Sequence, residues 1–105
     1  MNAKHRWSYE EDRYCCEKYI EFYVIQKSDT SASDFVRILA SALGDIKPTS
    51  LRMKVQNIKQ IMIEKHIPDS LQISPSANYS KQNLSALEIV RKLQVQVGHL
   101  LVEIL

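Results

Sequence analysis

Residues 47–66, KPTSLRMKVQNIKQIMIEKH, constrain the fold of this chain more than any other stretch. At about 100° of rotation per residue in an α-helix, its apolar residues fall in one narrow stripe, made of Leu51, Val55, Ile58 and Met62. Pro48 with Thr49 or Ser50 suits a helix start, and Pro68 suits its stop. The stretch has a net charge of +4, from five Lys/Arg against one acid, whereas the whole chain has +2. The sequence therefore predicts a basic amphipathic helix with one face on a core.

Composition favours helices throughout. The chain has 105 residues but only two Gly and three Pro, and 45% of it is hydrophobic. These values predict an all-α protein with one small domain and an appendage. No apolar run reaches the length of a membrane span, and the N-terminus has no apolar stretch typical of a signal peptide. We therefore expect an intracellular protein without a membrane partner.

Two more helices are predicted before residue 47. Ser8 and Glu11 form a capping box, from which a helix runs to about Gln26. A second helix follows, capped by Ser31 or Ser33, and we expect Gly44 to end it in a left-handed conformation. Three helices with a tight turn between the second and third are typical of a helix-turn-helix bundle. The expected core comprises Trp7, Tyr19, Tyr23, Phe35, Leu39, Leu43, Leu51, Val55, Ile58 and Met62.

The rest of the chain divides into two parts. Residues 67–82 contain two Pro and several Ser, so we predict a linker after a domain at residues 1–66, although its apolar residues can dock on the core. Residues 83–105 predict a C-terminal amphipathic helix. Its heptad seam predicts dimerisation through Val90, Leu93, Val97, Leu100 and Ile104. Two alternatives to dimerisation stay open: this helix packs on its own bundle, or it packs on a partner protein.

Three phrases carry a resemblance to a known family. RWSYEEDRYCCEKYIEFY, SDFVRILASALG and SLRMKVQNIKQIM resemble the Myb/SANT-like branch of helix-turn-helix domains. The third phrase is also similar to the N-terminal helical domain of some bacterial HNH-type restriction endonucleases. The chain departs from Myb repeats in having a single Trp, and it lacks the HNH constellation, so nuclease activity is not implied. The resemblance implies DNA binding and favours the bacterial cytoplasm or nucleoid over a eukaryotic nucleus.

The face of residues 47–66 away from the apolar stripe is the predicted DNA-reading face. Arginine and glutamine side chains pair with guanine and adenine edges in the major groove. The expected base contacts are Arg52, Gln56, Lys59 and Gln60, with Asn57 at their edge, and the expected phosphate contacts are Lys47, Lys54 and Lys65.

Other chemistries have little support in the sequence. No catalytic constellation, glycine-rich phosphate loop or metal-ligand spacing is present, so we expect no enzyme, no small-molecule substrate, no metal and no cofactor. Adjacent Cys15 and Cys16 are interpreted as packing residues. The leading hypothesis is a sequence-specific, dimeric transcriptional regulator that binds double-stranded DNA. The alternative is a protein-interaction module, an inhibitor or adaptor, acting through its apolar C-terminal helix.

Overall fold

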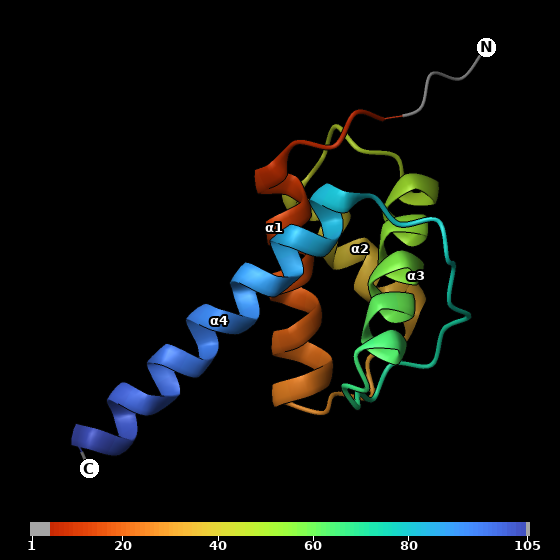
Figure 1. The fold of residues 1–105 in the computed structure, drawn as a ribbon. Coiled ribbons are helices and arrows are strands. Elements are labelled where there is room, and N and C mark those ends of the chain that lie inside the picture. The colour runs from red at the N-terminus through yellow and green to blue at the C-terminus, as the bar shows by residue number, and fades with distance from the viewer. Residues whose placement is uncertain (1–4, 105) are drawn as a thin grey trace.

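The structure, a computed structural model, describes the backbone of residues 5–104 and the side chains of residues 5–93. In this range it consists of helices and irregular segments with no strand, which confirms the predicted all-α class. Figure 1 shows α3 packed against α2 and α1, while α4 crosses the other side of α1. The helices are α1 (Tyr9–Tyr19), the π-helix η1 (Ile20–Ile25), α2 (Ala32–Ala42), α3 (Pro48–Glu64) and α4 (Lys81–Ile104).

The first helix starts as its capping box predicts. Ser8 Oγ accepts a hydrogen bond from the Glu11 amide at 3.1 Å, and Glu11 Oε1 accepts one from the Ser8 amide at 2.8 Å. The helix then widens into η1, where the amide of Gln26 donates to the carbonyl of Glu21 at 3.0 Å. Lys27 follows with φ of 51°, a left-handed conformation that ends the helix.

The ends of α2 and α3 differ in part from the prediction. Ser31, not Ser33, caps α2. The expected left-handed Gly44 is wrong, because no glycine of the described backbone has a positive φ and the chain turns already at Leu43. At α3, Lys47 occupies the cap position without a side-chain cap bond, and Pro48 opens the first turn.

A single core joins all the helices. Eight of the ten expected core residues are buried, whereas Trp7 and Leu43 are only partly buried. Aromatic rings form its centre, where Tyr23 and Phe35 lie with centroids 5.0 Å apart. From α4 the core also takes Ala86, Leu87 and Val90.

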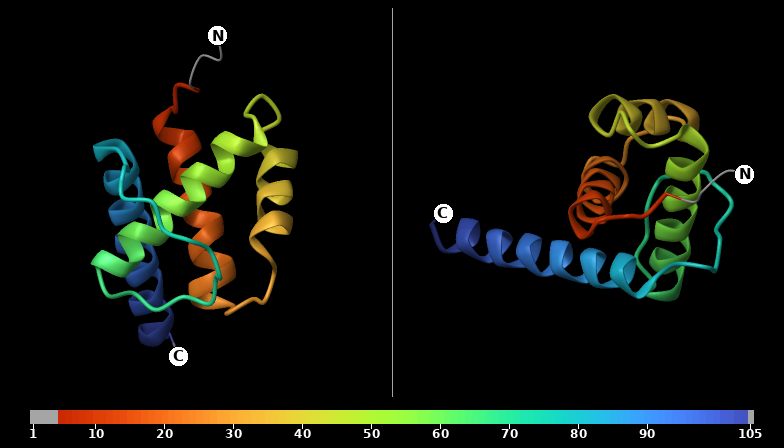
Figure 2. Two further views of the ribbon diagram at one scale, coloured as in Figure 1. Left: turned by 90° about the vertical axis from the view of Figure 1, so that its right-hand side faces the viewer. Right: turned by 90° about the horizontal axis from the view of Figure 1, so that it is seen from above.

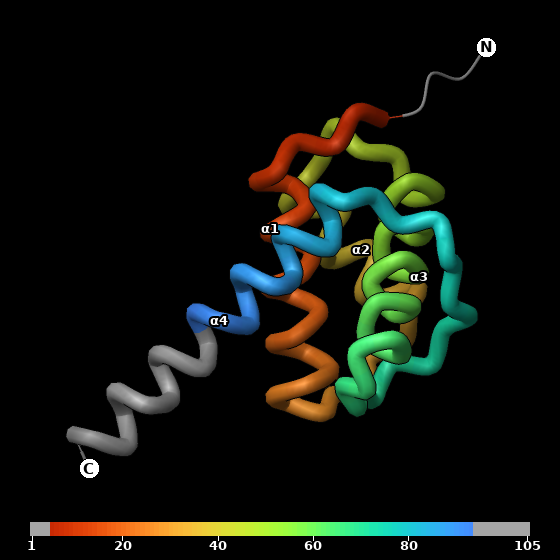
Figure 3. Tube along the Cα trace, viewed as in Figure 1, coloured from red at the N-terminus to blue at the C-terminus, as the bar shows by residue number. Residues whose placement is uncertain are grey.

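The segment between α3 and α4, residues 67–80, is packed across the bundle. We call it the crossing segment. Its Leu71 is buried, the amide of Ser70 donates to the Tyr23 carbonyl at 3.0 Å, and the amide of Ser76 donates to the Gln56 carbonyl at 3.1 Å. The left view of Figure 2 shows this segment passing over α3, and Figure 3 shows its path between the end of α3 and the start of α4. The predicted linker is therefore part of the folded unit and covers some of α3.

Candidate nucleic-acid interface

The predicted DNA-reading residues lie in three different environments. Lys47 and Arg52, near the start of α3, are exposed. Gln56 and Gln60 are half-buried, and Gln60 Nε2 lies 3.3 Å from Glu64 Oε1. The remaining four residues are buried or paired with acids of the same chain.

Lys54 and Asn57 are inside the protein, so their expected surface positions are wrong. They are only 4% and 7% exposed. Lys54 faces α1, where its Nζ lies 2.5 Å from Asp12 Oδ1, and the Asp12 side chain is fully buried. Lys54 is thus a structural cation, because a buried carboxylate beside it holds the ammonium group away from solvent.

The ion pair of Lys54 and Asp12 belongs to a larger polar network. Gln82 at the start of α4 donates from Nε2 to Asp12 Oδ2 at 2.6 Å and to the Trp7 carbonyl at 2.7 Å. Lys54 Nζ also lies 4.5 Å from the centroid of the Trp7 ring, a cation–π contact. This network ties the N-terminal arm, α1, α3 and α4 together at one end of the bundle.

The sequence of α1 contains a signal for this network. Asp12 precedes Cys15, Cys16 and Tyr19 by three, four and seven residues, so it continues the apolar stripe of α1. A lone acid on such a stripe requires a buried partner, and basic residues of α3 are candidates.

Lys59 and Lys65 are also engaged within the chain. Lys59 Nζ lies 3.0 Å from Asp69 Oδ1 and 3.0 Å from the Leu71 carbonyl, both on the crossing segment. Lys65 Nζ lies 3.1 Å from Glu88 Oε1 on α4, but this pair is more exposed to solvent. Both lysines therefore contribute less positive potential to the surface than the sequence suggested.

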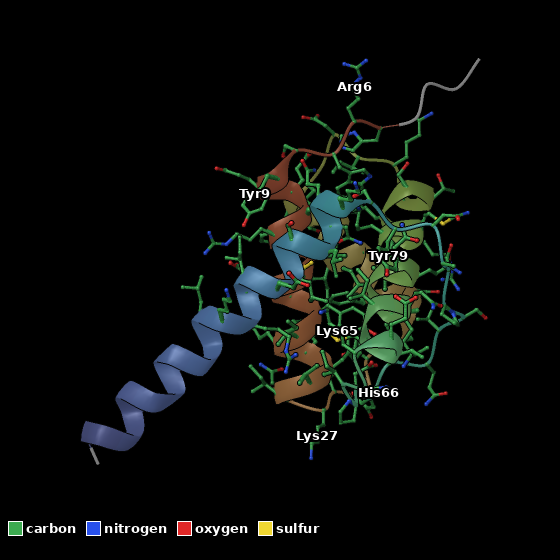
Figure 4. The ribbon with its side chains drawn as sticks, viewed as in Figure 1. Arg6, Tyr9, Lys27, Lys65, His66 and Tyr79 are labelled. Carbon is green, nitrogen blue, oxygen red and sulfur yellow. The ribbon has the colours of Figure 1, made fainter. Side chains whose placement is uncertain are left out.

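The crossing segment restricts the far half of α3. Tyr79 OH donates to Glu64 Oε2 at 2.5 Å, and this hydrogen bond raises the pKa of Tyr79. Figure 4 shows Tyr79 over α3, with Lys65 and His66 near the end of that helix and Arg6 pointing away at the opposite end. A major groove is about 12 Å wide and admits one helix. The crossing segment contacts α3 at Gln56 and Glu64, whereas Lys47 and Arg52 near the start of α3 are exposed.

The predicted dimerisation residues are only partly described. Val90 is 3% exposed and packs in the protein's own core, so its expected place on a dimer seam is wrong. Leu93 is 41% exposed, as is Ile89 one turn before it. Val97, Leu100 and Ile104 lie outside the residues whose side chains are described.

The described part of the chain has no disulfide and no cluster of metal ligands. Cys15 and Cys16 are both buried free thiols, and no group of three potential metal ligands occurs among the described residues. No helix in the searched part of the chain is long and apolar enough to cross a membrane.

Comparisons with protein-family models, curated proteins and solved structures find no match to this chain.

Proposed function

We propose that the protein is a small DNA-binding protein that contacts the duplex with the first turns of α3. The observation that carries this proposal is the exposure of Lys47 and Arg52 at a helix start without an acidic residue in its first turn. The partial positive charge of a helix N-terminus attracts phosphate. In helix-turn-helix proteins, the N-terminal residues of the second helix of the motif contact the bases.

The proposed contacts are fewer than the sequence predicted. In this proposal Arg52 reads a base, Lys47 binds phosphate, and Arg6 of the N-terminal arm binds phosphate or reaches a minor groove; all three side chains are exposed. Gln56 is half-buried at the edge of this surface. The proposal leaves out Lys54 and Asn57, which are buried, and Lys59 and Lys65, which are paired with acids of the same chain.

The test is a selection from random duplex, followed by titration of variants at two salt concentrations. Arg52→Ala should lose about 1–3 kcal/mol on the selected site and relax the preference at one base pair. Lys47→Ala should weaken all duplexes alike and reduce the salt slope by about one. The matched control is Arg37→Ala, since the Arg37 side chain on α2 is 81% exposed and outside the proposed surface. If Arg52→Ala and Lys47→Ala both bind like the control, the proposal is wrong.

A second candidate function is protein interaction through α4, with a second copy of this chain as partner. It is favoured by the exposed Ile89 and Leu93, four residues apart on one face of a helix that continues to Ile104. An apolar face of this kind is stabilised when a second helix covers it. In this arrangement the DNA-binding protein is a dimeric transcriptional regulator with two half-sites about one helical turn, or a multiple, apart.

Light scattering on the wild type and on Leu93→Lys tests self-association. The wild type should be a dimer and Leu93→Lys a monomer with an unchanged circular dichroism spectrum. Lys92→Glu is the control, because it also changes charge at an exposed position of α4 but keeps the apolar pair. A wild-type protein that stays monomeric at all concentrations tested contradicts this candidate.

A further inference from the structure

The second part of the crossing segment, residues 72–79, is held between two firm attachments. We call this part the strap. Before it, Leu71 is only 2% exposed, and the Asp69 carboxylate accepts hydrogen bonds from Lys59 Nζ and from the Leu71 amide, each at 3.0 Å. After it, Ser80 Oγ accepts a backbone hydrogen bond from the first turn of α4 at 3.0 Å. The strap is therefore fixed at both ends.

Between these ends the strap has few contacts. Among the described residues, it makes two hydrogen bonds to the rest of the protein. The Ser76 amide donates to the Gln56 carbonyl at 3.1 Å, and Tyr79 OH donates to the Glu64 carboxylate. No side chain of the strap is buried, and a cleft of about 730 Å³ lies between Ser76 and Asn78 on one side and the first half of α3 on the other. A segment with so few buried contacts opens more readily than the fold as a whole.

The strap lies across the face of α3 that carries Arg52. Arg52, Gln56 and Gln60 follow one another at intervals of four residues, so they share one face of the helix. Arg52 is exposed, but Gln56 and Gln60 are half-buried. The strap crosses at this level, as the bond from Ser76 to Gln56 and the left view of Figure 2 show. Lifting the strap would expose two more side chains that can pair with adenine.

Glu64 connects the strap to this face of α3. One oxygen of its carboxylate accepts from Tyr79 OH, and the other lies 3.3 Å from Gln60 Nε2. The same carboxylate therefore holds the end of the strap and occupies the amide of Gln60. Without the bond between Tyr79 and Glu64, the strap keeps only the hydrogen bond from Ser76 among those to described residues.

We propose that the strap opens while the rest of the fold stays closed, that the bond between Tyr79 and Glu64 holds it shut, and that its opening exposes Gln56 and Gln60 to DNA. This inference rests on the proposed DNA-binding function and adds regulation to the same surface. The closed form presents Arg52 alone of the three residues on this face, and the open form presents all three. DNA that contacts Gln56 binds the open form more tightly and shifts the equilibrium toward it.

Amide hydrogen exchange of the ¹⁵N-labelled full chain measures the opening without DNA. The Ser76 amide should exchange faster than the Ser70 amide, which donates to the Tyr23 carbonyl in the firmly held part of the crossing segment. Tyr79→Phe removes only the hydroxyl. It should raise the exchange rate of Ser76 about two- to tenfold, the effect of one lost hydrogen bond, and leave that of Ser70 unchanged. Tyr9→Phe is the control, because Tyr9 is also half-buried but lies on α1, away from the strap (Figure 4).

A second variant tests whether the effect comes from the bond itself. Glu64→Ala removes the acceptor at an exposed position and should accelerate Ser76 as Tyr79→Phe does. The double variant should exchange no faster than the faster single variant, because both substitutions remove the same bond. Unchanged exchange of Ser76 in Tyr79→Phe, equal acceleration of Ser70, or additive effects in the double variant overturn the proposal.

Titration of the selected duplex separates this inference from the proposed function. Tyr79→Phe should bind the duplex more tightly, by at most the factor measured for Ser76 exchange, because only the open fraction has increased. Adding Gln56→Ala to Tyr79→Phe should remove this gain. If Ser76 exchange accelerates but the affinity for the duplex does not rise, the regulatory role is wrong and the proposed function stands on Arg52. A wild type that binds no duplex contradicts the proposed function, whereas the exchange rates alone decide whether the strap opens.

Discussion

Replacing Lys54 by methionine tests whether the buried ion pair supports the fold. Met keeps most of the volume of the lysine stem but removes the charge, so Asp12 would keep only the hydrogen bond from Gln82. Breaking a buried pair by removing one partner costs about 3–5 kcal/mol, because an uncompensated charge stays in the interior. A domain of this size has a total stability of about 5–15 kcal/mol. We therefore expect Lys54→Met to lose a large part of the free energy of unfolding.

The matched control is the same substitution in a surface pair. Lys18 Nζ lies 3.2 Å from Glu21 Oε2, with side chains 32% and 44% exposed, and such pairs contribute about 0–1 kcal/mol. Urea unfolding followed by far-ultraviolet circular dichroism gives both free energies, and Asp12→Asn with Lys54→Met completes a double-mutant cycle. The double variant should be more stable than Lys54→Met alone, since Asn leaves no buried charge. If Lys54→Met costs no more than Lys18→Met, the pair does not support the fold as argued.

Three further predictions concern the core. Ile58→Ala should lower the free energy of unfolding by about 2–4 kcal/mol in the same urea assay, because Ile58 is fully buried, whereas Met53→Ala, at a half-exposed position, should cost much less. Burial raises the pKa of Cys15 to about 12 and also raises that of Cys16, so neither thiol should react with a thiol reagent at about pH 8 until urea unfolds the protein. The thiols have a pKa near 9.0 in the unfolded chain and a higher pKa in the folded protein. Below pH 9 the thiols are protonated in both states, and their contribution to the free energy of unfolding is fully present. As the pH rises from 9 toward 12, ionisation favours the unfolded chain and this contribution is lost. The urea midpoint should fall across that interval, and an unchanged midpoint contradicts this prediction.

The helices were predictable because their signals are local. The capping box at Ser8 and the apolar stripe through Ile58 depend on residues three or four positions apart, and the structure has helices at both places. The π-helix η1 was not predicted, since its apolar residues match an α-helical stripe equally well. The αL conformation expected for Gly44 was wrong because a glycine permits this conformation without requiring it.

The candidate interface was less predictable because its residues are decided by tertiary contacts. Lys54 is one of five basic residues in the stretch 47–66, and its sequence neighbours do not show that it faces Asp12. Lys59 was expected to be exposed but is paired with Asp69. Asp69 lies on a segment whose sequence has no helical or strand periodicity, so the sequence does not place it beside α3. A charged residue is assigned to the surface by default, and only the position of its partner overrides that assignment.

The bonds of Gln82 have a consequence for the order in which the protein folds during synthesis. Gln82 and Asp12 are separated by 70 residues. At about 5–20 residues per second, a ribosome needs roughly 4–14 s to add that length. Throughout this interval Asp12 has no access to the amide that completes its hydrogen bonding, and the face of α1 that α4 will cover has no partner. The hydrogen bonding of Asp12 and the covering of that face of α1 can therefore be completed only after α4 has been made.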